Sequence, residues 1–482
     1  MINEKMYGLG DEPSAIRELF AYGMARKAEI GAENVFDFSI GNPSVPAPEL
    51  VRETMLELLD MDPVALHAYS PAAGLPEVKE AIAAYLSERY DTTATSGHLY
   101  LTAGAAAALA SSIAAVTHPG DEVVVVSPYF PEYRTWIEAA GCTIVEVPAA
   151  VPSFQPDIEA LRAAIGPKTS AVIINTPNNP VGAVYTRESL EALAAMLRER
   201  EEALGRPLYL ISDEPYRELV YDGLEPAWIP SLYDATFVCY SWSKSFSLPG
   251  ERIGYLLVPD TMPDFDHVYK AVCGAGRSLG YICDSVLFQL AVAECVDAPI
   301  DIEPYDRNRK ILYDGLKEIG YNVIYPQGAF YMWIEALEPD AQAFCETCRQ
   351  HELLLVPSDG FLTKGWTRVG YCCDEATIRG ALDALGIPSA WVTNFLVRKA
   401  AHFTEYAVLG ILAARAFDLR RGAPSARIAL ACAVLVLVPS IDEAIQLFVA
   451  GRSGQVTDVL LDCCGAATGA CLTALVSSLH RP

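Results

Sequence analysis

The stretch ATFVCYSWSKSFSLPGERIGY (235–255) decides how the rest of the sequence is interpreted. It begins as an apolar run of the kind that forms a buried strand, and it ends in polar residues. Of the ten lysines in the chain, Lys244 alone follows such a run with hydroxyl residues three and one positions before it, Ser241 and Ser243. Arg252 comes eight positions later, after a proline-glycine break. One amine beside hydroxyls and a guanidinium is a set of groups suited to a ligand.

Three other apolar runs end in the same way, and helical patterns such as ESLEALAAMLRERE (188–201) lie between them. These runs are DEVVVVSPYF (121–130), TSAVIINTPNNP (169–180) and PLYLISDEPY (207–216). Continuous apolar strands that alternate with helices predict an α/β fold with a mostly parallel central sheet flanked by helices. Ligands of such sheets bind beyond the carboxyl ends of the strands. Residues expected at this edge are Asn175, Asn179, Asp213, Tyr216, Ser241, Ser243 and Lys244.

The chemistry of these groups points to an aldehyde and a phosphate. A lysine amine can form a Schiff base with an aldehyde, and two serine hydroxyls with the Arg252 guanidinium suit a phosphate. LTAGAAAALASSIAAV (101–116) runs through Gly104 into an alanine-rich helix, whose first amides are free donors. By itself this segment is more typical of an ordinary helix, and it indicates a phosphate only together with the serines and Arg252. An aldehyde and a phosphate on one ligand indicate pyridoxal 5′-phosphate (PLP).

The remaining polar residues then have roles. A carboxylate such as Asp213 can keep the pyridine nitrogen of PLP protonated, so that the ring accepts electrons from a carbanion. Tyr216 and Asn179 are placed to hydrogen-bond the phenolic oxygen of the ring. Phe130, in SPYFPEY, is placed either to lie on the ring face or to pack in the core.

Residues 1 to about 388 resemble the class I/II aminotransferases of PLP fold type I. The motifs that carry the resemblance occur in the same order along the chain, and the combination of Asn-Pro, Asp-x-x-Tyr and Ser-x-Ser-Lys is specific. They are IGNPSVPAP (40–48), HAYSPAAGLPEV (67–78), the 101–109 turn, SPYFPEY (127–133), NTPNNPVG (175–182), SDEPY (212–216), SWSKSFSLPGERIGY (241–255), GAFYMW (328–333) and TRVGY (367–371). Alanines fill the 104–108 turn where relatives often have a second glycine or a polar residue, a change that leaves the backbone donors in place.

The resemblance implies a role for each matching residue. Lys244 would be the Schiff-base lysine and general base, and Asp213 the partner of the pyridinium. The phosphate would be held by Ser241, Ser243, Arg252 and the backbone amides of Ala105 and Ala106, and Tyr69 would reach the phosphate of a neighbouring subunit. Arg368 would clamp the substrate α-carboxylate, with Gly41 beside it. A homodimer with shared active sites is therefore expected.

The same resemblance implies transamination between an L-amino acid and a 2-oxo acid in two half-reactions, with ping-pong kinetics. A β-lyase or a decarboxylase of the same fold is an alternative, and so is a membrane protein whose front domain only binds PLP. Arg277, in CGAGRSLGY, lies in a segment where dicarboxylate-specific relatives carry an arginine for the distal carboxylate. Its other interpretation is a solvated or phosphate-side arginine. We favour an aspartate- or glutamate-type donor, with aromatic or neutral amino acids as the alternative.

The domains expected from these patterns are an aminotransferase over 1–388 and a separate tail over 389–482. Within the first, a large PLP-binding domain would cover about 46–289, and a smaller α/β domain would combine about 1–45 with 290–388. The chain has 35 basic and 61 acidic residues, which argues against nucleic acid as a partner. The start of the chain lacks the pattern of a signal peptide. A cytoplasmic catalytic domain is therefore expected.

The thirteen cysteines are scattered and are expected to be reduced. Cys345 and Cys348 form a C-x-x-C on a helical pattern, but no second pair stands at zinc spacing. A redox or metal role is therefore not predicted, and no metal is expected.

The tail differs in composition, with eight basic and six acidic residues after Pro388. It contains apolar stretches at about 400–417, 427–450 and 456–479, which approach the length of a membrane span. Each also holds ionisable residues, which are His402 and Glu405, Asp442 and Glu443, and Asp458 and Asp462. Sparse ionisable residues in spans are typical of functional membrane sites. Three helices of a soluble bundle are the alternative to a membrane-embedded tail.

From RKAAHFTEY through DEAIQLFVAGRSG to DVLLDCCGAATG, the tail resembles the VanZ-like membrane family. Relatives have a further helix before the RK-x-x-H motif, where aminotransferase sequence stands in this chain. The arginine-rich loop at Arg415 to Arg427 should face the cytoplasm. The helix before it would then start outside, where a PLP enzyme should not be. Three explanations of this conflict are possible. The helix does not cross the membrane, the charge rule fails here, or the chain is a truncated gene fusion whose tail is a remnant.

Overall fold

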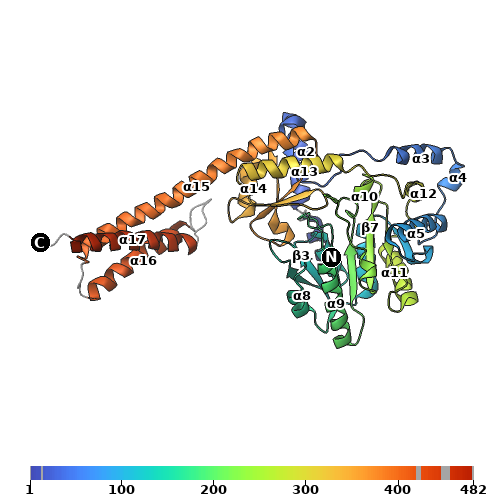
Figure 1. Cartoon of the computed structure of the whole chain (residues 1–482), viewed down its shortest axis with the longest axis horizontal. Coiled ribbons are helices and arrows are strands. Elements are labelled where there is room, and N and C mark those ends of the chain that lie inside the picture. Colours follow the sequence, from blue (N-terminus) through green and yellow to red (C-terminus); the bar gives the residue numbers. More distant parts are fainter. Residues whose placement is uncertain (1, 12–14, 420–424, 447–455, 480–482) are drawn as a thin grey trace. The chain divides into compact units, whose positions relative to one another are not determined.

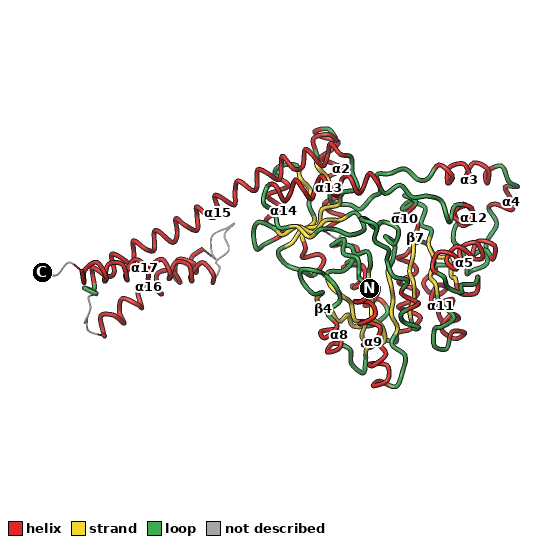
Figure 2. Tube along the Cα trace, viewed as in Figure 1, coloured by secondary structure: helices red, strands yellow, loops and turns green. Residues whose placement is uncertain are grey.

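The structure, a computed structural model, describes residues 2–11, 15–419, 425–446 and 456–479, without side chains for 15, 387–402, 442–446, 456–458 and 477–479. The chain divides into two compact units, Met1–Gly386 and Ile387–Pro482. Figure 2 shows that the first unit mixes helices and strands, whereas the described part of the second is helical.

A seven-stranded sheet forms the centre of the first unit (Figure 1), in the order β2-β8-β7-β6-β5-β3-β4. The strands are β2 (Leu99–Thr102), β3 (Glu122–Ser127), β4 (Thr143–Pro148), β5 (Thr169–Asn175), β6 (Tyr209–Asp213), β7 (Thr236–Ser241) and β8 (Gly254–Leu257). Pairs among β3 to β7 are parallel, and β8 alone runs antiparallel to both of its neighbours. The predicted mostly parallel sheet is therefore confirmed.

Helices cover this sheet, and their sequences explain where they begin and end. They include α5 (Pro76–Tyr90), α6 (Ala105–Val116), α7 (Glu132–Ala139), α8 (Ile158–Ala164), α9 (Arg187–Leu204), α11 (Phe265–Leu279) and α12 (Val286–Glu294). In α9 the Thr186 side chain caps the first turn, and Gly205 ends the helix with a left-handed φ of 66°. Leu190, Leu193 and Leu197 form its buried face, at the spacing of an amphipathic helix.

The register of the parallel strands gathers the polar residues at one edge. Asn175, the last residue of β5, pairs with Asp213, the last residue of β6. Ser241 ends β7 and faces Gly254, where the chain returns as β8. Lys244 lies on α10 (Trp242–Ser245), the single helical turn that directly follows β7. Residues that are far apart in sequence thus meet at the carboxyl ends of three adjacent strands.

A second, smaller sheet is antiparallel, in the order β12-β13-β10-β9. Its strands are β9 (Val323–Ile324), β10 (Tyr331–Glu335), β12 (Val356–Pro357) and β13 (Trp366–Gly370), and β1 (Phe36–Asp37) pairs with β11 (Leu353–Leu354) in a separate two-stranded sheet. The helices α13 (Glu303–Glu318) and α14 (Ala341–Arg349) also belong to this region. Its apolar cluster includes Phe38, Leu312 and Val369. The division into domains at about 45/46 and 289/290 stays a prediction.

Further helices are α1 (Glu4–Asp11), α2 (Ala15–Ile30), α3 (Glu49–Leu59) and α4 (Pro63–Leu66). The last helix that begins in the first unit, α15 (Glu375–Ala416), continues past residue 386. No run of Gly, Ser or Pro residues separates the two units near residue 388, and the helix has no break in secondary structure there.

The second unit contains the end of α15 together with α16 (Ser425–Gln446) and α17 (Val456–Leu479). The α15 and α17 backbones approach closely at glycines. A Cβ added to Gly410 would lie 1.9 Å from the Ala466 carbonyl oxygen, and one added to Gly469 would lie 1.9 Å from that of Ala407. Small residues at such crossings are common in membrane helix pairs.

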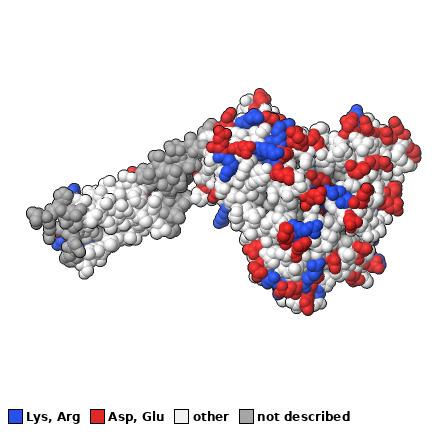
Figure 3. Space-filling view, viewed as in Figure 1, with Lys and Arg blue, Asp and Glu red and all other residues white. Residues whose placement is uncertain are grey.

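Among the residues described, one helical segment, Val459–Val476, is long and apolar enough to cross a membrane, and Ser425–Ile441 is a shorter apolar helix. Large apolar side chains of the tail are exposed, with Leu412, Leu437 and Leu460 each more than half accessible. Figure 3 shows few charged atoms on the described surface of the tail and many on the first unit. The ionisable side chains of His402, Asp442, Glu443 and Asp458 lie outside the described residues.

Candidate active site

A cavity of about 270 Å³ opens at the carboxyl edge of the large sheet, where twelve of the fourteen predicted site residues line it. They are Gly41, Ala105, Ala106, Phe130, Asn179, Asp213, Tyr216, Ser241, Ser243, Lys244, Arg252 and Arg368. The other two, Tyr69 and Arg277, do not line the cavity. Tyr69 is 95% exposed, and Arg277 is exposed in the last turn of α11.

The Lys244 amine lies inside this cavity. Its Nζ donates a hydrogen bond to the Gly41 carbonyl oxygen at 2.6 Å and lies 5.5 Å from the centre of the Phe330 ring. Burial lowers the pKa of Lys244 from 10.5 to about 8, and the nearby charges of Arg368 and Arg252 act in the same direction. A large fraction of the amine is therefore neutral near pH 8, which is the form that attacks an aldehyde.

The absence of a side chain at Gly41 leaves room for Tyr331 beside it. A Cβ at this position would lie 1.8 Å from the hydroxyl oxygen of Tyr331, a distance at which one of the two groups must move. The Tyr331 hydroxyl is in turn 2.9 Å from the hydroxyl of Tyr216, so the three residues define one wall of the cavity.

The Asp213 carboxylate is buried at the end of β6, and its two oxygens differ in their hydrogen bonding. Oδ2 accepts a short hydrogen bond from the Tyr133 hydroxyl and lies 3.5 Å from Nδ2 of Asn175. Oδ1 is buried and has no hydrogen-bond partner within the described part of the chain. Burial raises the pKa of Asp213 to about 7. A buried acceptor at a cavity without a donor fits a ligand that brings its own N–H, such as a protonated pyridine ring.

Hydroxyl, guanidinium and amide donors also line this cavity. The hydroxyls of Ser241 and Ser243 touch each other, and Arg252 adopts a left-handed φ of 56°. Gly104 has a φ of 77°, and a Cβ there would lie 2.9 Å from Nη2 of Arg252. No side chain caps the start of α6, so the amides of Ala105 and Ala106 have no acceptor from the helix itself. This donor set fits a phosphate group.

Arg368, on β13, forms a second cationic position. Its Nη1 donates to Oδ1 of Asn179 at 3.1 Å, and its Nη2 donates to the Ser39 carbonyl oxygen at 2.6 Å. The guanidinium lies 4.6 Å from the Tyr331 ring centre, and its buried Nε has no partner among the residues that the structure describes. A buried guanidinium with a spare donor, facing the same cavity as Lys244, suits a carboxylate.

Several lining residues escaped prediction from the sequence. Tyr331, Trp136, Ile16 and Ile40 also line the cavity, and Tyr133 holds Asp213. The motifs SPYFPEY and GAFYMW contain Tyr133 and Tyr331, but an aromatic residue in an apolar run looks the same whether it lines a site or fills a core. Ile16 comes from α2, and no pattern in that helix indicates contact with a site.

A buried lysine with a lowered pKa, a buried carboxylate oxygen without a partner among the described residues, and a set of donors suited to phosphate line one cavity at the edge of this sheet, and together they fit a PLP enzyme of fold type I. The profile of the family "Aminotransferase class I and II" matches residues 33–385, which is most of the chain. The chain therefore belongs to the class I and II aminotransferases, and it is a PLP-dependent aminotransferase. The resemblance noted from the motifs is confirmed.

Relatives agree with this assignment. The chain is 33% identical over 355 residues to the aspartate/prephenate aminotransferase of Thermus thermophilus, covering 71% of this chain and 88% of that protein. It is 32% identical to the aspartate aminotransferase of Thermotoga maritima, covering 73% and 91%. The crystal structure of an aminotransferase from Eubacterium rectale superimposes with a TM-score of 0.78 at 49% identity, covering 80% of this chain and 98% of that one.

The tail also matches a known family. The profile of the family "VanZ/LLP1" matches residues 328–477. This match begins within the first unit, so it overlaps the aminotransferase match over residues 328–385. The resemblance of the tail to VanZ-like proteins is confirmed.

Proposed function

We propose that the cavity transfers the amino group of an L-amino acid to a 2-oxo acid through PLP bound to Lys244. One observation carries the proposal: the Lys244 amine, with its lowered pKa, and the unpartnered Asp213 Oδ1 line the same cavity. An amine and a carboxylate are the groups that the aldehyde and the ring nitrogen of PLP require.

The remaining residues would hold the cofactor. Ser241, Ser243, Arg252 and the amides of Ala105 and Ala106 would bind its phosphate. Asn179 and Tyr216 would contact the ring oxygen, and Phe130 would lie on the ring face. When bound, PLP withdraws electrons from the substrate α-carbon and so makes its proton acidic.

The chain's own groups would then act on the amino acid. Arg368 would bind the α-carboxylate in a fork-to-fork pair and so orient the α-carbon towards Lys244, with Gly41 beside the carboxylate. Lys244 Nζ would remove the α-proton as a general base and then, as a general acid, donate it to the C4′ carbon of the cofactor.

Incubation of the purified full-length protein with PLP, an amino acid panel and 2-oxoglutarate tests this proposal. We expect glutamate to accumulate with a matching amount of the new 2-oxo acid, and Lys244→Ala to abolish it. Pyruvate and ammonia without glutamate would establish a β-lyase, and carbon dioxide release would establish a decarboxylase. PLP binding with no turnover of any donor would support a front domain that only binds the cofactor.

The preferred donor depends on a second subunit. We propose a homodimer in which Tyr69 reaches the partner's phosphate and Arg277 reaches the distal carboxylate of an aspartate- or glutamate-type donor. Both residues are exposed and lie outside their own cavity. Within the described lining, the cations are Lys244, Arg252 and Arg368, and each already has a proposed role. An acidic side chain therefore needs a cation from elsewhere.

Ile16, Ile40 and Trp136 on the same cavity support the competing donor class, amino acids with neutral or aromatic side chains. Arg277→Ala separates the two. If the donor is acidic, kcat/KM for aspartate should fall about 100-fold, since a charge-assisted pair is lost, while kcat/KM for phenylalanine stays the same. Arg379→Ala, which removes an exposed arginine on α15, is the matched control. An equal, small effect on both donors would favour the neutral class.

For the tail, we propose insertion in a lipid bilayer through α17, supported by the VanZ/LLP1 match and by the apolar segment Val459–Val476. The catalytic unit would face the cytoplasm. Extraction of cell membranes with alkaline carbonate should leave the full-length chain in the pellet. Release into the supernatant would favour a soluble helical bundle.

A further inference from the structure

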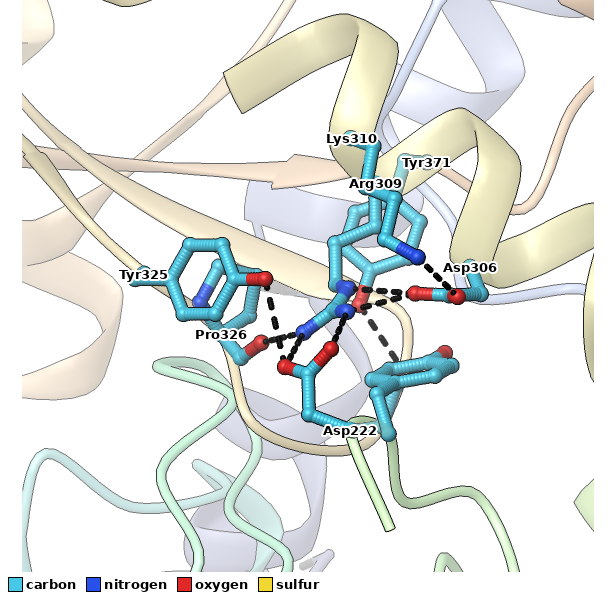
Figure 4. Close-up of polar contacts among 9 residues, drawn as sticks. Asp222, Asp306, Arg309, Lys310, Tyr325, Pro326 and Tyr371 are labelled. Atoms are coloured by element: carbon cyan, nitrogen blue, oxygen red, sulfur yellow. Dashed lines mark hydrogen bonds and ion pairs between the residues drawn. The ribbon is translucent and has the colours of Figure 1, made fainter. Parts of the chain in front are cut away.

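Arg309, on α13, is fully buried and uses every N–H of its guanidinium (Figure 4). Nη1 and Nη2 donate to the two carboxylate oxygens of Asp222 at 2.9 and 2.8 Å. Nε and Nη2 donate to Oδ1 of Asp306, and Nη1 also donates to the Pro326 carbonyl oxygen at 2.8 Å. A buried arginine with all five donors paired is held in one orientation.

Two aromatic rings complete the surroundings of this guanidinium. Its central carbon lies 4.4 Å from the ring centre of Tyr221 and 4.7 Å from that of Tyr325. Tyr221 precedes Asp222 and Tyr325 precedes Pro326, so each ring comes from a segment that also supplies an acceptor. Arg309 therefore joins three parts of the chain, which are α13, residues 221–222 and residues 325–326.

These segments support a strained turn. The hydroxyls of Tyr221 and Tyr371 both donate to the carbonyl oxygen of Ala329, whose own amide donates to the Leu219 carbonyl at 2.8 Å. Ala329 has a φ of 57°, a left-handed conformation that costs a residue with a Cβ about 1–2 kcal/mol. The turn keeps this shape because its carbonyl and amide are held on both sides.

The turn leads directly into the cavity. Two residues after Ala329 comes Tyr331, whose hydroxyl is 2.9 Å from that of Tyr216 and whose ring lies against Arg368. Tyr216 is tied to the same framework, because its carbonyl oxygen accepts from the Leu219 amide at 2.9 Å. The two segments that Arg309 holds, 221–222 and 325–326, are therefore connected along the chain to Tyr216 and Tyr331, which line the cavity.

We propose that Arg309 is a positioning residue for the reaction, acting through Asp222 and Tyr221 to fix the Tyr216 and Tyr331 hydroxyls in the cavity. This inference rests on the proposed function, in which Tyr216 contacts the ring oxygen of PLP. A shift of that hydroxyl changes how strongly the protonated form of the bound cofactor is stabilised. The pH midpoint of the cofactor's visible absorbance therefore reports the position of the tyrosine pair.

Arg309→Lys is the first variant, because it keeps the charge and loses the planar fork and the stacking. We expect the absorbance midpoint to shift by at least about half a pH unit. We also expect kcat per bound cofactor to fall about tenfold with KM within about twofold, since small displacements at a reacting centre have effects of this size.

Tyr221→Phe is the second variant, because it removes only the hydroxyl that donates to Ala329 and leaves the ring against Arg309. It should shift the midpoint in the same direction with a smaller loss of thermal stability. Arg307→Lys changes an exposed arginine on the same helix, whose partners are Glu303 and Glu375. It is the control and should leave the midpoint unchanged.

A lower melting temperature in Arg309→Lys and Tyr221→Phe, with the midpoint and kcat per bound cofactor unchanged, would overturn the inference and leave Arg309 a structural residue. If Arg309→Lys does not fold, Tyr221→Phe alone decides between the two outcomes. Failure of the proposed function is recognised separately, since the unaltered protein would then bind PLP without turnover or show no visible band.

Discussion

The proposed attachment of PLP to Lys244 depends on the charge state of the lysine amine. Burial depresses the amine pKa to about 8, because water no longer stabilises the ammonium form. The neutral, nucleophilic form is therefore abundant at a pH where an exposed lysine, with a pKa near 10.5, is almost wholly protonated. Cofactor attachment becomes feasible near neutral pH without any neighbouring base.

We expect the rate of PLP attachment to the cofactor-free protein to rise with pH and level off above a midpoint near 8. The sign follows from the depressed pKa, since the amine loses its proton at lower pH than in the unfolded chain. Stopped-flow absorbance measures the rate, and Lys244→Ala is the control that should show no attachment. A midpoint near 10 would mean that the amine is solvated.

Arg368→Ala should weaken substrate binding far more than cofactor binding. Removal of the fork loses a charge-assisted pair with the α-carboxylate, so KM or the substrate dissociation constant should rise about 100-fold, while the PLP dissociation constant stays within about threefold. Titrations with an amino acid and with PLP measure the two. Equal losses would contradict the assigned role and would indicate that the bonds of Arg368 to Asn179 and Ser39 shape the cavity as a whole.

At the scale of elements, the start of α6 connects backbone conformation to phosphate binding. Gly104 combines a positive φ with a close approach to Arg252, so it is constrained in two independent ways. Gly205, at the end of α9, shares the positive φ but has nothing within 4 Å of an added Cβ. Substitution of both glycines therefore distinguishes two free-energy costs, that of a positive φ in a residue with a Cβ and that of displacing Arg252.

Gly104→Ala and Gly205→Ala should each lower the unfolding free energy by about 1–2 kcal/mol. Only Gly104→Ala should weaken PLP binding, about tenfold or more, because it displaces a charge-assisted donor to the phosphate. Denaturant titration and PLP titration give the two quantities. Similar PLP affinities in both variants would show that Arg252 adapts without cost.

The sequence predicted the elements whose side chains form long, continuous patterns. The four apolar runs correspond to β3, β5, β6 and β7, since a strand buried on both faces needs an unbroken apolar run. The strands β9, β11 and β12 have two residues each and carry no periodicity to detect. The antiparallel direction of β8 was also not predicted, because direction depends on tertiary pairing.

The site was predictable where chemistry demanded a rare residue type at a strand end. Lys244 and Asp213 are such residues, and both line the cavity. Arg368, in the middle of β13, was instead predicted from the motif TRVGY, and it also lines the cavity. Tyr331 and Arg309 were not predicted, because their importance arises from contacts between segments distant in sequence. Tyr69 and Arg277 illustrate the opposite case, since their expected roles need a second subunit.

At the scale of the whole molecule, the chain combines a catalytic unit with its own cores and a helical unit of different composition. The first unit contains every described residue that lines the cavity. Its seven-stranded sheet is complete before residue 260, and its smaller sheet is complete before residue 375. The catalytic unit should therefore fold without the tail.

A fragment of residues 1–386 should be recovered without detergent and should bind PLP with the affinity of the full-length chain, within about twofold. Fluorescence titration with PLP and a thermal melt of both proteins measure this. Aggregation of the fragment, rescued when the tail is restored, would show that the catalytic unit depends on the second unit for stability.

The antiparallel return of β8 has a consequence for ligand choice. Lys244 and Arg252 lie near the two ends of the connection between β7 and β8. Ser241 and Gly254, which bound this connection, pair with each other. The length of that connection affects the separation between the amine and the guanidinium, and so the size of a compound that can contact both. Lengthening or shortening residues 245–251 would therefore select for a molecule of another size before it altered any reactive group.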